Sequence, residues 1–175
     1  VSVDCVVFGY NGDALKVLLI HQKIQDGGPL TESGLQMALP GDLVKAEETL
    51  SECADRVLFE LTSIEGIFLK QFHSFGDPDR VNGEKDLKWL ETFREFPHKR
   101  IITIAYYALV SLHEYNPEAS SFAGSIQWVD VGKVPELAFD HNEIFRYAVT
   151  TLRAHIETHH IGFELLPKKF TLSQL

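Results

Sequence analysis

The residues best suited to chemistry lie within one stretch of the chain, residues 39–62. Among its charged side chains, the carboxylates of Glu48 and Glu60 and the guanidinium of Arg56 are the candidates. The run Thr49–Glu52 reads Thr-Leu-Ser-Glu, a capping-box pattern that predicts the start of a helix. Arg56 and Glu60 then lie one turn apart on that helix, with Glu48 just ahead of it. Carboxylate oxygens at such a place either bind Mg²⁺ or form ion pairs with a nearby cation.

The same stretch resembles the Nudix box. In that family a Gly-Gly loop and an early glutamate precede a helix with the signature Arg-Glu-apolar-x-Glu-Glu. The resemblance makes Leu39–Asp42 the loop, Glu48 the early glutamate and Arg56 the signature arginine. In working members three carboxylates at spacings i, i+3 and i+4 share one helix face. They hold Mg²⁺ against a pyrophosphate and activate the attacking water.

Two of these three carboxylates are missing from this chain. The i and i+4 positions are Val57 and Leu61, only Glu60 remains, and Asp42 replaces the second glycine. One glutamate holds the ion weakly, and apolar neighbours raise the cost of placing a divalent charge there. We therefore expect no catalytic residue and no metal site, with Glu60 as a residual ligand at most. Glu48 and Arg56 are expected to pair and tie the loop to the helix.

The elements around the box agree with the same family. An Asn-Gly turn joins the first two predicted strands, and apolar periodicity predicts a helix from residue 50 to about residue 61 and another from Asp140 to about residue 158. The resemblance implies an α+β protein with the Nudix fold, a mixed β-sheet sandwiched between helices (an α/β/α sandwich). An aromatic insertion interrupts it at residues 83–99. Strands are predicted over residues 3–8, 15–20, 67–75, 101–112 and 126–131.

A second group of residues resembles a Phe…Asp-Arg…Arg pattern of one Nudix subgroup. It consists of Phe75, Asp79, Arg80 and Arg100. Two arginines bracketing the start of a strand can bind a phosphate or sugar hydroxyls through the guanidinium fork. A plain surface turn at Asp79 and Arg80 is the alternative. Gln22 stands where related sensors present a cation, which favours a neutral sugar over a diphosphate.

The C-terminal residues narrow the resemblance. Residues 161–175 contain Leu-Leu-Pro-Lys-Lys-Phe-Thr-Leu, similar to the tail of Nudix-related transcriptional regulators, the NrtR and AraR group. In that group the tail leads into a winged-helix DNA-binding domain. We expect residues 1–160 to form a ligand-sensing domain and residues 161–175 to be a linker and the start of a truncated winged-helix domain. The resemblance also implies a homodimer, a sugar or ADP-ribose-like effector, and DNA contact through the missing domain.

Composition limits the remaining partners. The net charge is −9, with 25 acidic and 16 basic side chains, so the domain by itself is poorly suited to binding nucleic acid. No apolar run approaches the roughly 20 residues that span a bilayer, and no signal peptide is visible. Cys5 and Cys53 each lie within an apolar pattern and are interpreted as buried and reduced. These features predict a cytoplasmic protein without a membrane partner.

The leading hypothesis is an effector-binding domain of a bacterial-type transcriptional regulator without hydrolase activity and without a cofactor. The alternative is a Mg²⁺-dependent Nudix hydrolase of a nucleoside diphosphate derivative such as ADP-ribose, using Glu48 and Glu60. A third hypothesis is a protein-interaction module that uses the insertion around Trp89, Phe93 and Phe96. The sequence favours the first because the helix lacks the oxygen ligands that the second requires.

Overall fold

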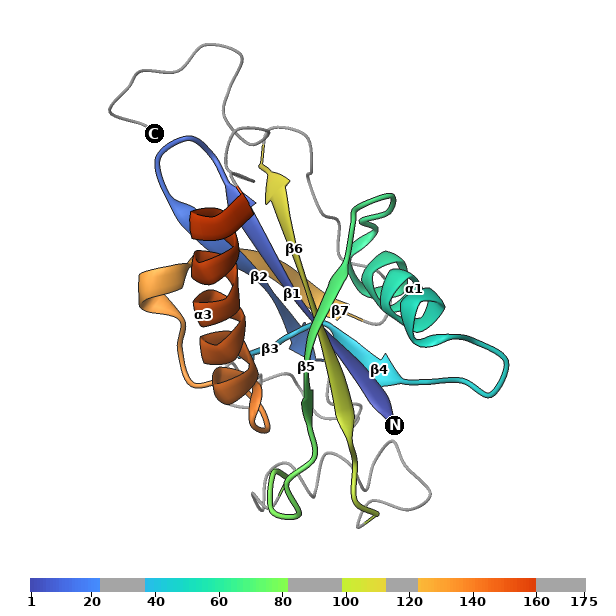
Figure 1. Cartoon of the computed structure of the whole chain (residues 1–175). Helices are drawn as coiled ribbons and strands as arrows, with labels where there is room; N and C mark the ends of the chain where they lie inside the picture. The colour runs from blue at the N-terminus through green and yellow to red at the C-terminus, as the bar shows by residue number, and fades with distance from the viewer. Residues whose placement is uncertain (23–36, 82–98, 113–122, 160–175) are drawn as a thin grey trace.

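One mixed β-sheet forms the centre of the molecule (Figure 1). The computed structural model describes residues 1–22, 37–81, 99–112 and 123–159. The sheet order is β3-β2-β1-β6-β5, with β4 on β1 and β7 on β2. The strands are β1 (Ser2–Tyr10), β2 (Leu15–Gln22), β3 (Met37–Ala38), β4 (Gly41–Leu43), β5 (Lys70–Phe75), β6 (Thr103–Ser111) and β7 (Ala123–Asp130). The helices are α1 (Leu50–Thr62), the short 3-10 helix η2 (Val131–Lys133) and α3 (His141–His159).

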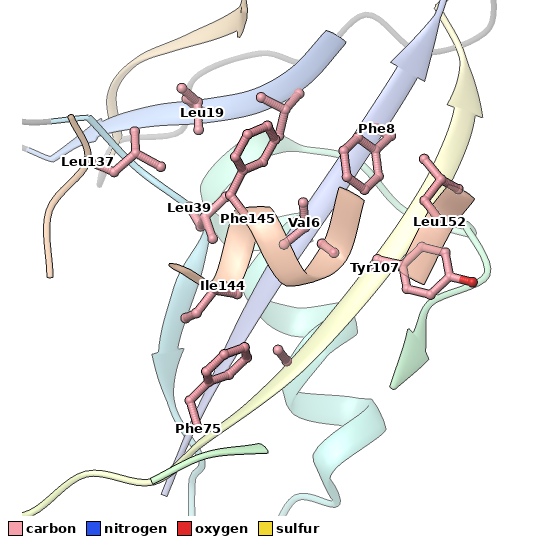
Figure 2. Close-up of a cluster of buried hydrophobic side chains, with 13 residues drawn as sticks. Val6, Phe8, Leu19, Leu39, Phe75, Tyr107, Leu137, Ile144, Phe145 and Leu152 are labelled. Atoms are coloured by element: carbon pink, nitrogen blue, oxygen red, sulfur yellow. The ribbon is translucent and has the colours of Figure 1, made fainter. Parts of the chain in front are cut away.

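The two long helices cover opposite faces of the sheet (Figure 1). Side chains along β1 alternate between the faces, so Val3 and Val7 pack under α1 while Val6 and Phe8 pack under α3. Figure 2 shows the second set, in which the rings of Phe8 and Phe145 lie 6.3 Å apart. The predicted sandwich of helices around a mixed sheet is confirmed. Neither α1 nor α3 has the length and apolarity that a membrane span requires, within the residues described.

The hairpin of β1 and β2 opens toward the start of β1. One edge of β1 pairs in parallel with β6 along its length, and its other edge is shared by β2 at Phe8–Tyr10 and β4 at Ser2–Asp4. The facing edge of β2 likewise pairs with β3 at Ile20–His21. Residues 37–43 therefore fill the gap between the diverging strands. This pairing places the loop of the Nudix box against the first residues of β1.

Helix α1 begins and ends as its sequence predicts. The Thr49 hydroxyl accepts a hydrogen bond from the Glu52 amide, and the Glu52 carboxylate accepts one from the Thr49 amide at 2.7 Å, so the predicted capping box is confirmed. The helix ends at Thr62, where Ser63 adopts a left-handed conformation with φ of 57°. Its apolar stripe faces the sheet.

Some predicted boundaries differ from the structure. Strand β5 begins at Lys70 instead of residue 67, because Ile67 and Leu69 pack against the α1-side core before pairing with β6 starts. Strand β7 begins earlier than predicted, at residue 123. On α3 the predicted stripe is buried as far as Leu152, but Ile156 is 40% exposed. The predicted loop at 25–35, the insertion at 83–99 and the tail at 161–175 lie outside the described residues.

Gly41 is required by the close approach of β4 to β1. A Cβ atom at this position would lie 1.9 Å from Oδ1 of Asp4, whose side chain is buried. Because Asp4 is held within the sheet, it cannot move aside freely. This contact gives a structural reason for the one glycine of the box loop that the chain retains.

Gly41→Ala is expected to destabilise the fold by about 2 kcal/mol, since the added methyl group displaces Asp4. Urea unfolding measured by circular dichroism provides the test. Gly132→Ala is the matched control, because a Cβ there meets no atom within 4 Å. The control should stay within about 0.5 kcal/mol of the wild type. Equal stabilities for the two variants would contradict this role for Gly41.

Candidate functional site

Arg56 is the centre of the charged cluster formed by the Nudix box. Its Nε and Nη2 atoms donate to the two carboxylate oxygens of Glu48, both at 2.8 Å, which confirms the predicted ion pair. Nη1 donates to Asp42 at 3.1 Å and to Glu60 at 2.9 Å, and Nη2 also donates to the carbonyl of Leu43 at 2.9 Å. Since a guanidinium has five N–H donors, these bonds use all of them. We call this set of residues the Arg56 cluster; it joins α1 to β4 and to the loop between them.

The carboxylate of Glu48 is held in its charged form. Hydrogen bonds from Arg56, then from the Lys45 amide, lower the pKa of Glu48 from 4.5 to about 2. The bond to Glu48 likewise raises the pKa of Arg56 above its usual value. Glu60 accepts from Arg56 through one oxygen and from the Lys45 ammonium group through the other, at 3.5 Å. Both oxygens of the one remaining metal-position carboxylate therefore already contact cations.

The other two metal positions are part of the packed interior. Val57 is 1% exposed and belongs to the core under α1. Leu61 packs against that core and against a smaller cluster of Ile20, Ala38 and Ala138. The prediction that these residues extend the apolar stripe of the helix is confirmed. Among the described residues, no three His, Cys, Asp or Glu side chains are grouped so as to hold a metal ion.

Neither cysteine has the properties of a nucleophile. Both are unpaired and buried, as the sequence predicted. Burial raises the pKa of Cys53 to about 12, with a further contribution from its hydrogen bond to Glu48. Burial also raises the pKa of Cys5 well above its usual value. A thiol reacts as its thiolate, so both side chains act as small core residues.

The second predicted group gathers at the turn between β5 and β6, but its members have different environments. Arg80 is 6% exposed and pairs with Asp140 through two hydrogen bonds of 2.7 and 2.8 Å. Its Nη1 atom donates to the hydroxyl of Thr103 at 3.2 Å. Asp140, predicted to cap α3, has both carboxylate oxygens engaged by this arginine. Arg80 thus belongs to the interior and not to an exposed turn.

The other residues predicted to contact the effector differ in exposure. Arg100 is exposed, and its Nε donates to the carbonyl of Gly76 at 3.1 Å, as does its Nη2. Phe75, the last residue of β5, is 6% exposed and lies in the core beside the start of β6 (Figure 2). Asp79 is exposed in the turn that precedes Arg80. Gln22 ends β2, and the placement of its side chain is outside the described structure.

Several buried polar contacts near the site were not predicted from the sequence. Asp4 lies 3.5 Å from Nε2 of His141, and Nδ1 of His141 accepts the amide of Leu39 at 3.0 Å. The hydroxyls of Ser2 and Thr103 form a hydrogen bond between β1 and β6. A carboxylate inside the apolar run of β1 was a visible signal for a buried polar contact. Its partner lies more than a hundred residues away, so the pairing itself left no local pattern.

The two groups meet at the first residues of β1. Ser2 pairs with Leu43 of β4 on one side and with Thr103 of β6 on the other. Leu43 belongs to the Arg56 cluster, and Thr103 accepts from Arg80. One short segment of β1 therefore separates the degenerate box from the second group.

The comparisons with known proteins agree with this geometry. A family model described as NUDIX domain matches residues 1–148. The ADPR responsive transcriptional repressor NtrR of Acinetobacter baylyi (strain ATCC 33305 / BD413 / ADP1) is 28% identical over 178 residues, covering 99% of this chain and 62% of that protein. This chain thus spans less than two thirds of the length of that relative.

Two solved structures share the fold. The MutT/nudix family protein from Enterococcus faecalis aligns with a TM-score of 0.72 and 26% identity, covering 99% of this chain and 69% of that chain. The NUDIX domain of Shewanella oneidensis NrtR, crystallised with ADP ribose, aligns with a TM-score of 0.67 and 24% identity over 86% of each chain. The resemblance drawn from the box is confirmed, and the chain belongs to the NUDIX domain family.

Proposed function

We propose that this domain binds an effector of the ADP-ribose class and serves as the sensing domain of a transcriptional regulator, without hydrolysing the effector. The Arg56 cluster carries the proposal: Glu60 is held by two cations, and the neighbouring metal positions are Val57 and Leu61. A sensor needs differential binding but no turnover, so it can lose its metal ligands. The ADPR responsive NtrR relative and the ADP ribose complex of the NrtR domain support the class of effector.

Two polar groups, one exposed and one buried, have hydrogen-bonding capacity that an effector could use. Nη1 of the exposed Arg100 has no hydrogen-bond partner among the described residues. Nδ1 of His21, next to Gln22 at the end of β2, is buried and likewise has no partner in the described part of the chain. A guanidinium binds phosphate or hydroxyl oxygens, and an imidazole nitrogen binds a ribose hydroxyl. A neutral sugar such as arabinose is the alternative effector, since Gln22 brings no cation.

The wider assembly is proposed from the same relationship. A repressor contacts DNA, and the net charge of −9 argues against contact through this domain. We place that contact in a winged-helix domain following residue 160 and expect a homodimer. No metal ion is needed for effector binding in this proposal.

Isothermal titration of the protein with ADP-ribose is expected to give saturable binding. Arg100→Gln should weaken it about tenfold, because a charged hydrogen bond to the effector is lost. Arg153→Gln, an exposed arginine of α3, is the matched control and should bind as the wild type does. Absence of heat from both ADP-ribose and arabinose, with an intact fold, would rule out the proposed function.

No hydrolysis of ADP-ribose is expected with Mg²⁺ or Mn²⁺. The metal positions of the helix offer only the carboxylate of Glu60, which is already paired with two cations, whereas a divalent ion needs several oxygens. Chromatography of the nucleotide after incubation should show AMP formation equal to that of a protein-free blank. Metal-dependent AMP release that Glu60→Gln abolishes would instead establish the hydrolase alternative.

The Arg56 cluster is expected to stabilise the fold in a pH-dependent way. Because the pKa of Glu48 falls from 4.5 to about 2 on folding, its contribution is present above pH 4.5 and is lost as the pH falls toward 2. Thermal unfolding across this window should therefore show a steeper loss of Tm for the wild type than for Glu48→Gln. Glu47→Gln, an exposed neighbour, should retain the wild-type slope. Identical slopes for wild type and Glu48→Gln would show that this ion pair contributes nothing.

A further inference from the structure

The first turn of α3 is anchored by two adjacent residues that bind in different directions. Asp140, which immediately precedes the helix, accepts two hydrogen bonds from Arg80 in the turn after β5. His141, the first residue of the helix, contacts Asp4 of β1 and accepts the amide of Leu39 from the loop of the box. Since Nδ1 of His141 is an acceptor, the ring carries its proton on Nε2, facing Asp4.

The backbone of Asp140 completes this anchor. Its carbonyl accepts the amides of Glu143 at 2.8 Å and Ile144 at 3.2 Å, which are first-turn amides of α3. A carboxylate at this end also interacts favourably with the helix dipole. The position of Asp140 therefore fixes the start of α3, and Arg80 fixes the position of Asp140.

Arg80 itself is poorly placed to contact an effector. Its side chain is buried, and Nε, Nη1 and Nη2 all donate to Asp140 or Thr103. An effector phosphate at this guanidinium would have to displace a bidentate carboxylate from a site with little water. Arg100, in contrast, is exposed and lies against Gly76 in the same turn.

We infer that Arg80 is a positioning residue, which ties the turn contacted by Arg100 of the proposed effector site to the start of α3 and acts on effector binding only through that connection. The inference rests on the proposed function for its effector, but the anchoring itself exists in the free protein. Movement of the turn on effector binding would shift Asp140 and with it the first turn of α3. Among the described residues, the ion pair with Asp140 is the side-chain bond that connects Arg80 to the start of α3.

The test compares Arg80→Lys, the single variants Arg80→Asp and Asp140→Arg, and the double variant that exchanges the two charges. Lysine keeps the charge but cannot form the two-pronged bond, so the protein should fold with a looser anchor. Hydrogen exchange at the amides of Glu143 and Ile144 is measured with and without ADP-ribose. Affinity for ADP-ribose is measured by titration on the same samples.

Free Arg80→Lys protein is expected to exchange these two amides about tenfold faster than the wild type, with affinity for ADP-ribose within about threefold. The charge-exchanged double variant should recover both slow exchange and affinity, because the ion pair is rebuilt. If Arg80→Lys and the double variant lose affinity as strongly as Arg100→Gln while exchange in the free proteins stays slow, Arg80 contacts the effector and the inference is wrong. Unchanged exchange in free Arg80→Lys also overturns it.

Failure of the proposed function gives a different result. If the wild-type protein does not bind ADP-ribose, the proposed effector is wrong. Faster amide exchange in free Arg80→Lys, with slow exchange recovered in the double variant, would still support the anchoring role of Arg80. The two outcomes are read from separate measurements on the same protein.

Discussion

Burial of β1 on both faces is the constraint on which the rest of the structure depends. The strand pairs with β6 along its length and with β2 and β4 on its other edge, while α1 and α3 cover its faces. Any polar side chain on such a strand must find a partner within the protein. Ser2 therefore bonds to Thr103, and Asp4 contacts His141. These contacts bring the start of α3 and the turn carrying Arg80 to one end of the sheet.

The Nudix box of this chain retains its structural residues but only one of the three metal-position carboxylates, Glu60. The residues that remain are those that position the helix: the capping box, Gly41 against Asp4, and the Glu48–Arg56 pair. The Glu48–Arg56 pair is partly shielded from solvent, so it is worth more than an exposed ion pair. The helix of the box is thus positioned by contacts that require no metal ion.

The sequence predicted what depends on local pattern. The capping box located the start of α1, and the spacing of Glu48 and Arg56 in the box predicted their ion pair. It could not predict that Arg80 pairs with Asp140, because the two are separated by 60 residues and only the folded sheet brings them together. Arg80 was accordingly predicted to contact an effector, whereas the structure shows its buried side chain paired with Asp140. Strand β5 was predicted too long because apolar residues that pack on a helix resemble those of a strand.

Val57 and Leu61, which stand where the Nudix box has carboxylates, also contribute to the packing of the fold. Leu61 packs against a cluster that contains Ala138, a residue of the loop that leads into α3. A carboxylate at either position would now be placed among apolar side chains, where burying an unpaired charge is strongly unfavourable. Restoring the family's ligands one at a time would therefore oppose folding before it could bind a metal. Leu61 therefore packs against the same cluster as the loop that leads into α3, so a residue at a metal position also contributes to the packing between the box helix and that loop.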